Sequence, residues 1–78
     1  MNLNKSSSNI LIHILNGHTT ASSIAEQLEG ADIRSIQRGI QRLVELSLVE
    51  RLGASNNPSY KPNFAQILEA KIPAVIKF

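Results

Sequence analysis

The sequence predicts a small, mostly helical α+β domain with three core helices, a two-stranded hairpin and an additional C-terminal helix. Apolar residues recur at helical spacing in several segments, glycines separate these segments, and a turn-forming stretch joins two short extended ones. A chain of 78 residues buries only ~60% of the surface that it exposes when unfolded, so it carries one modest core. Its 42% hydrophobic and 18% charged residues are typical of a globular domain and exclude a disordered one.

The first helix is expected from 9 to 16. Residues 1–8 are polar and serine-rich, and we expect them to form a flexible N-terminal arm, with Ser7 or Ser8 capping the helix that follows. This helix is apolar nearly all round, which predicts a central place in the core. Gly17 follows it directly and favours its end.

The second helix is expected from 21 to 29, with Thr20 as its N-cap and Gly30 as its break. The third helix is expected from 33 to 46, with Asp32 as its cap. One face of the second helix is apolar at i, i+3, i+4 and i+7 spacing and should be buried, namely Ala21, Ile24, Ala25 and Leu28.

A hairpin should follow the third helix. Residues 48–52 form its first strand, 53–57 its turn and 58–61 its returning strand, which Pro62 ends. The predicted order is therefore three helices, with tight breaks between them, followed by a hairpin. This is the order of a winged helix-turn-helix domain, which we predict over 9–62.

A fourth helix is expected near the C-terminal end, from 63 to 71. Asn63 and Gln66 have the spacing of a capping box, and the helix has an apolar face of Phe64, Ile67 and Leu68. We expect residues 63–78, a C-terminal helix and tail, to be a possible dimerisation element, because two-fold symmetric operators are read by dimers. The alternative is that these residues simply cover the core of a monomer.

The third helix has one basic face. At about 100° per residue its three arginines fall within ~80° of arc, opposite the apolar residues, and two glutamines flank them. Gly39 falls on the border of the two faces, where a missing side chain lets another helix or a sugar-phosphate strand approach closely, or has no role. Of these we favour the close packing of another helix. No acidic residue occurs between 33 and 44, whereas solvated arginine faces usually carry glutamates at i+4. The face consists of Arg34, Arg38 and Arg42 with Gln37 and Gln41.

Such a face has the chemistry of a recognition helix. Arginine can bridge the guanine O6 and N7 atoms, glutamine can pair with the adenine edge, and the major groove admits one helix. We therefore expect helix 33–46 in the major groove and the wing, 49–61, on the backbone or in the minor groove. The start of the second helix offers hydroxyls to a phosphate. The candidate DNA-binding residues are Thr20, Ser22, Arg34, Ser35, Gln37, Arg38, Gln41, Arg42, Asn57 and Lys61.

The segment 31–40 resembles the recognition-helix signature of DeoR-type winged-helix repressors. Asp32 stands at the serine cap of that signature, Ser35 at its threonine, Ile36 at its isoleucine and Arg38 at its second arginine.

The resemblance covers about residues 10–62. Within it, 24–28 is similar to the family's Leu-Ala-Glu-x-Leu, and 48–51 resembles its route into the wing. It implies a winged helix that binds operator DNA through the third helix, as a repressor-like regulator of transcription. Gln37 replaces the family's first arginine and Gly39 its acid, and the 78 residues contain no counterpart of its effector domain. The resemblance therefore implies the DNA-binding fold, and not regulation by a sugar phosphate.

The sequence also bears on other function classes. A winged helix can instead be a protein-interaction module, or this chain the N-terminal domain of a larger regulator. RNA binding is disfavoured because single-strand recognition uses rows of exposed aromatics. His13 and His18 have no partners at catalytic spacing, so we expect no enzyme. Without cysteine we expect no metal site or other cofactor, and no small-molecule effector is evident.

The net charge is +2, which is too small to indicate nucleic acid by itself. No apolar run approaches the ~18 residues of a membrane span, and the first residues lack the pattern of a signal peptide. The expected location is therefore the cytoplasm, and the expected partners are double-stranded DNA and a second copy of the chain.

Overall fold

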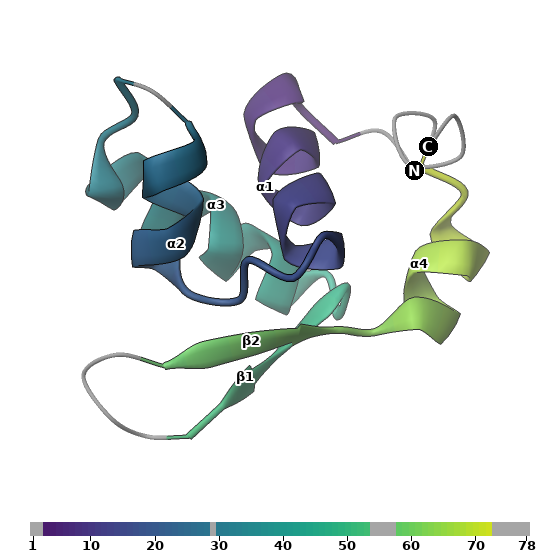
Figure 1. Ribbon diagram of the computed structural model, residues 1–78. Helices are drawn as coiled ribbons and strands as arrows, with labels where there is room; N and C mark the ends of the chain where they lie inside the picture. The colour runs from purple at the N-terminus through teal and green to yellow at the C-terminus, as the bar shows by residue number, and fades with distance from the viewer. Residues whose placement is uncertain (1–2, 29, 54–57, 73–78) are drawn as a thin grey trace.

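The computed structural model describes residues 3–28, 30–53 and 58–72. Within these residues the chain forms four helices, each begun by a capping residue, and one two-stranded antiparallel sheet (Figure 1). The predicted α+β class and the order of the elements are confirmed. In chain order the elements are α1 (Lys5–Leu15), α2 (Ala21–Gln27), α3 (Ile33–Glu45), β1 (Val49–Leu52), β2 (Ser59–Pro62) and α4 (Phe64–Ala70).

Helix α1 begins earlier than the sequence predicted. Asn4 is its N-cap and accepts a hydrogen bond from the backbone N–H of Ser7 at 2.7 Å. Residues 5–8 are therefore helical, so the expectation of a flexible arm is wrong for them, and neither Ser7 nor Ser8 is the cap. Asparagine caps a helix as well as serine does, and the two small serine side chains are buried inside the fold.

Helices α1 and α3 end in the same hydrogen-bonded motif, in which a residue with positive φ follows the C-cap. After α1, Gly17 has a φ of 101° and donates to Ile14, as the sequence predicted for this helix stop. After α3 the equivalent residue is Ser47, with a φ of 63°. The N–H of Leu48 then reaches the carbonyl of Leu43 at 2.9 Å, and both side chains are fully buried.

Side-chain caps start the next two helices where the sequence placed them. Thr20 accepts from the N–H of Ser23 at 3.1 Å and begins α2, while Asp32 accepts from the N–H of Arg34 at 3.2 Å and begins α3. Helix α2 ends at Gln27, before the predicted residue 29, which lies outside the described residues.

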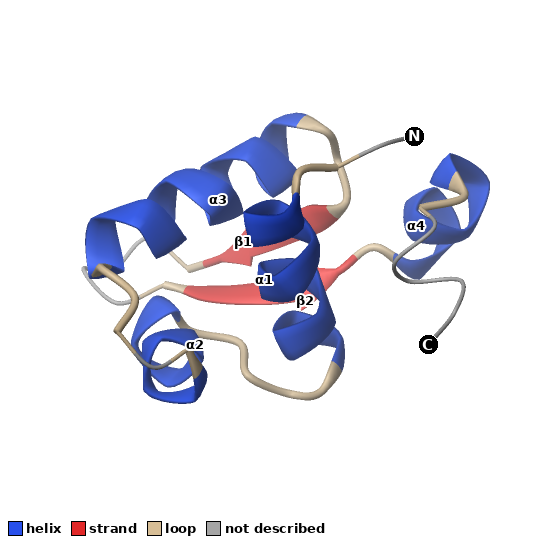
Figure 2. Ribbon diagram, turned by 90° about the horizontal axis from the view of Figure 1, so that it is seen from above, coloured by secondary structure: helices blue, strands red, loops and turns tan. Residues whose placement is uncertain are grey.

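The core lies where α1 and α2 pack against α3 and the hairpin closes beneath them (Figure 2). Gly39 allows a close approach of α3 to α1, because a Cβ atom at this position would clash with Cδ1 of Ile10 on α1. The predicted close packing at this glycine is confirmed. The buried apolar residues are Ile10, Leu11, Ile14, Ile24, Ile36, Ile40, Leu43, Leu48, Val49, Ile67 and Ile72.

The hairpin is hydrogen-bonded to the helical part of the domain through β2. In its register Val49 pairs with Pro62 at the base and Leu52 with Ser59 toward the turn, whose residues 54–57 lie outside the described part. The N–H of Tyr60 donates to the carbonyl of Thr19, in the connector between α1 and α2, at 2.8 Å. The hairpin is therefore bonded to a segment far from it in the sequence.

Helix α4 follows the hairpin and lies at the edge of the molecule (Figure 1). Asn63 caps it by accepting from the N–H of Gln66 at 3.3 Å, as the capping-box spacing predicted. Its predicted apolar face is only partly buried, because Ile67 packs into the core whereas Phe64 and Leu68 are 62% and 77% exposed. Among the described residues, no helix is long and apolar enough to cross a membrane.

Candidate functional site

The basic face of α3 is fully displayed on the surface. Its buried side consists of Ile36, Ile40 and Leu43. All six candidate residues on this helix are exposed. The buried and exposed sides of α3 are therefore the ones that helical periodicity predicted. Arginine and glutamine side chains on one exposed helix face present charged and amide donors together. These six residues are Arg34, Ser35, Gln37, Arg38, Gln41 and Arg42.

One arginine of this face has an acidic partner. Arg42 Nη1 lies 3.8 Å from a carboxylate oxygen of Glu45, one turn further along α3. The expectation of an arginine row without acidic partners is therefore wrong for Arg42, because Glu45 lies just beyond the segment without acids and still within the helix. Both side chains are more than half exposed, so the pair is weak, and Arg42 can exchange it for another anion.

The start of α2 presents hydroxyls, but one of them is already engaged. The Thr20 oxygen accepts the cap hydrogen bond, which leaves its hydroxyl hydrogen for another acceptor. Ser22 is exposed in the first turn. Ser23 Oγ lies 2.9 Å from Nδ1 of His18, which ties this helix start to the end of α1.

The hairpin contributes less positive charge than the sequence indicated. Lys61 is exposed on β2, but the register places it opposite Glu50, which is also exposed, so a carboxylate offsets its charge. Tyr60 is partly buried and packs against the core, so its ring is not free to stack on a base. Asn57, the remaining candidate, lies outside the described residues.

A polar groove of about 280 Å³ runs between the first turn of α1 and the basic face of α3. Sequence analysis missed it, because it depends on the tertiary contact that Gly39 permits and not on any local pattern. Asn4, Ser6 and Ser7 line it from α1 and its cap. Helix α3 contributes Ser35, Gly39 and two charged residues, Arg38 and Arg42.

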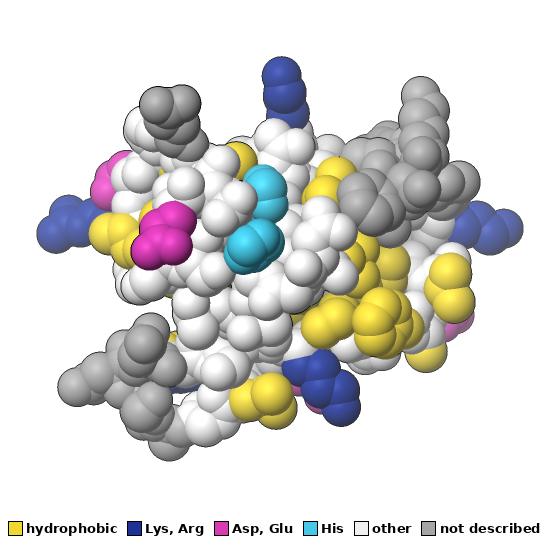
Figure 3. All heavy atoms as spheres, viewed as in Figure 1, with side chains coloured by type: hydrophobic (Ala, Val, Ile, Leu, Met, Phe, Trp, Pro, Cys, Tyr) yellow, Lys and Arg dark blue, Asp and Glu magenta, His cyan; other side chains and the backbone are white. Residues whose placement is uncertain are grey.

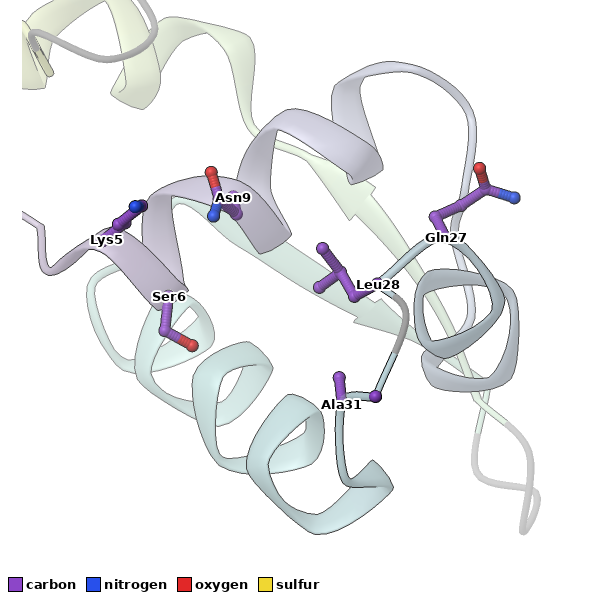
Figure 4. A pocket seen from close by; sticks show the side chains of 7 residues that line it. Lys5, Ser6, Asn9, Gln27, Leu28 and Ala31 are labelled. Atoms are coloured by element: carbon purple, nitrogen blue, oxygen red, sulfur yellow. The ribbon is translucent and has the colours of Figure 1, made fainter.

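A second, more open hollow of about 550 Å³ lies on the other side of the α1 start, facing the turn between α2 and α3 (Figure 4). Leu28 points into it from the end of α2, whereas Gln27 points away, and Lys5 is the one charged residue among the described residues that line it. Ser6 borders both hollows, so the first turn of α1 separates them. This hollow was also not predicted, and it contains none of the candidate DNA-binding residues.

The face formed by α1, α2 and α4 does not gather positive charge. Figure 3 shows its Lys and Arg side chains as single groups around the rim, with the two histidines near the middle. The rings of His13 and His18 pack edge to face with centroids 5.9 Å apart. Within the described ranges, no group of three or more histidine, cysteine or acidic side chains is placed to hold a metal ion.

The structure therefore brings the six candidate residues of α3 together on one face, with the α1 groove along its edge. It leaves Thr20 and Ser22 at the start of α2 and Lys61 on the hairpin as separate polar positions. In comparisons with known proteins, no family model, no curated protein and no solved structure matches the chain.

Proposed function

We propose that this protein is a winged helix-turn-helix domain that binds double-stranded DNA in a sequence-specific way and acts as a repressor-like regulator of transcription. In this proposal α3 enters the major groove and β1 and β2 form the wing, which follows the backbone or the minor groove. The observation that carries the proposal is the exposed face of α3, where Arg34, Arg38 and Arg42 lie opposite the buried stripe.

The chemistry of this face supports duplex DNA over other anionic partners. Three guanidinium groups can contact phosphate or the guanine edge, and two amides between them can pair with adenine. A face that bound phosphate alone would need no amide side chains, whereas a base-reading face uses both kinds of donor.

Fluorescence anisotropy with labelled duplex DNA, across a salt series, tests the proposal. We expect the wild type to bind with an affinity that falls steeply with salt, because phosphate contacts release counterions. The double variant Arg34→Ala/Arg38→Ala should lose at least about tenfold, since each bidentate base contact is worth ~1–3 kcal/mol.

A matched control distinguishes the effect of this face on DNA binding from the effect of net charge. Arg38→Ala and Lys71→Asn each remove one positive charge, and asparagine tolerates the left-handed backbone of Lys71. We expect only Arg38→Ala to weaken binding strongly. Absence of binding by the wild type at low salt, or equal losses in the two variants, would contradict the assignment of α3 as the reader.

We also propose that the protein acts as a homodimer through α4, whose exposed Phe64 and Leu68 form an apolar surface. Two copies would double the number of bases that a single short helix reads. The same apolar surface is the observation that favours the second candidate function, a winged-helix protein-interaction module. Val75, Ile76 and Phe78, also expected at this interface, lie outside the described residues.

A further inference from the structure

The first residue of α3 is an apolar residue that lies outside the core. Ile33 is 40% exposed, and it is not among the apolar side chains that form the core or pack against it. On α1, α2 and α3, all of whose residues the structure describes, it is the one large apolar side chain that is exposed. A β-branched residue is also a poorer helix former than an unbranched one. Neither burial nor helix propensity therefore explains an isoleucine at this position.

Ile33 adjoins the face of α3 that carries the arginines and glutamines. It directly precedes Arg34, and Gln37 follows it at i+4, which places the side chains of Ile33 and Gln37 next to each other on the helix surface. Both Arg34 and Gln37 are exposed. The Cα–Cβ bonds of a helix tilt toward its N-terminus, so the first residue projects at the helix tip. This end of α3 therefore presents an apolar group beside an amide and a guanidinium.

The charge at this helix end favours a base edge over a phosphate. Asp32, the N-cap of α3, is exposed, and its carboxylate would repel a phosphate placed at the tip. In helix-turn-helix proteins the N-terminal residues of the recognition helix contact the base edges in the major groove. Those edges present hydrogen-bonding atoms and, on thymine alone among the bases, an apolar 5-methyl group. An apolar side chain at the tip is complementary to that methyl group.

We propose that Ile33 contacts the 5-methyl group of a thymine in the major groove and so selects an A·T pair beside the bases that Arg34 and Gln37 read. The inference rests on the proposed function and deepens it by naming a base that an apolar residue selects. The contact removes the methyl group and the exposed part of Ile33 from water, which is favourable for both. The candidate residues that the sequence indicated on α3 are all polar, so none of them supplies this contact.

Removal of the methyl group from the DNA tests the contact. The probe is a duplex that the wild type enriches from a library of random-sequence duplexes. It is compared, by fluorescence anisotropy, with the same duplex in which one thymine at a time is replaced by uracil, which pairs as thymine does and lacks only the 5-methyl group. We expect uracil at one of these positions to weaken wild-type binding about fourfold, as loss of one buried methyl group would.

Two variants assign the effect to one side chain. Ile33→Ala and Leu52→Ala each shorten an apolar side chain that is 40% or 47% exposed, the first on α3 and the second on β1 of the hairpin. In Ile33→Ala the thymine and uracil duplexes should bind equally, because the group that meets the methyl is gone. Leu52→Ala should keep the difference of about fourfold, because the backbone and the minor groove offer no methyl group to the hairpin. Both variants should unfold close to the wild-type midpoint, since both side chains are exposed.

The outcomes distinguish this inference from the proposed function. Sequence-specific binding that depends on Arg38 but is unchanged by uracil at every thymine, or an enriched duplex without thymine, overturns the thymine contact alone. A uracil effect that persists in Ile33→Ala, or that disappears in Leu52→Ala as well, overturns the assignment to Ile33. A wild type that binds no duplex, or that enriches no sequence, overturns both the inference and the proposed function.

Discussion

At the scale of single residues, Gly39 is the position that most needs an explanation, because glycine inside a helix lowers its stability by ~1 kcal/mol relative to alanine. The contact with Ile10 accounts for it. A methyl group on residue 39 would overlap the end of the Ile10 side chain, which is only 1% exposed. The helical period placed Gly39 on the border of the core, but only the fold identifies Ile10 as its neighbour.

We expect Gly39→Ala to lower the free energy of unfolding by about 1 kcal/mol, because overpacking costs more than the gain in helix propensity. In an Ile10→Val background, which lacks the clashing methyl, the same change should instead raise it by about 1 kcal/mol. Urea unfolding of the four proteins measures both steps. The same effect of Gly39→Ala in both backgrounds would exclude Ile10 as the cause.

Ser47 and Gly17 have equivalent places after α3 and α1, yet only the glycine was predictable as a helix stop. Glycine is typical of positions with positive φ, whereas serine gives no such indication. At Ser47 the turn is closed by the hydrogen bond from the N–H of Leu48 to the carbonyl of Leu43, and burial of both leucine side chains holds it in place. Ser47 adopts the left-handed backbone that this turn requires.

Ser47→Gly should therefore stabilise the protein by about 1 kcal/mol, since it relieves the strain of a side chain in the left-handed region. For a domain of this size the melting temperature should rise by about 4 °C or more, measured by circular dichroism. Ser35→Gly, within the regular part of α3, is the control and should destabilise. A loss of stability in both variants would contradict the strain at Ser47.

At the scale of elements, the types and the order followed from periodicity and caps, while the boundaries depended on packing. The start of α1 was misplaced because Asn4, Ser7 and Ser8 are all good capping residues. A polar sequence also indicated solvent exposure, whereas small serines can be buried at a close helix contact. The face of α3 was predictable, because an exposed helix separates its polar and apolar sides at a fixed period.

Charge on α3 gives a prediction at this scale. Glu45→Gln frees Arg42 from its pair and removes a carboxylate beside the proposed reading face, so duplex affinity should rise about two- to fivefold at low salt. Glu69→Gln, an exposed residue on α4, makes the same change in net charge away from this face. Equal gains in the two variants, measured by anisotropy, would show an effect of net charge alone.

At the scale of the whole molecule, the sequence could not predict the groove or the larger hollow beside α1. Each is lined by residues from segments that are distant in the sequence, such as Ser6 and Arg38, so neither has a local pattern. The exposed side of α4 was also unpredictable, because periodicity groups Phe64 and Leu68 with Ile67 although only Ile67 reaches the core.

The association of two molecules tests the role proposed for this surface. We expect Phe64→Ser/Leu68→Ser to be monomeric in sedimentation equilibrium and to unfold close to the wild-type midpoint, while the wild type is dimeric. Ile67→Ser, in the same helix but 5% exposed, should instead unfold at a lower temperature. A wild type that is monomeric at high concentration would contradict the dimer.

The hydrogen bond between Tyr60 and Thr19 has a consequence for how the molecule would meet its partner. It joins the hairpin to the connector between α1 and α2, and α3 packs against both of these helices, so the hairpin and α3 keep a fixed separation. In a protein that binds duplex DNA as proposed, this separation sets the distance between the duplex positions that α3 and the hairpin contact. A duplex whose twist and groove width match it is bound without deformation, and other duplexes must bend or unwind first, so the protein would select operators by their shape at base pairs that it never touches.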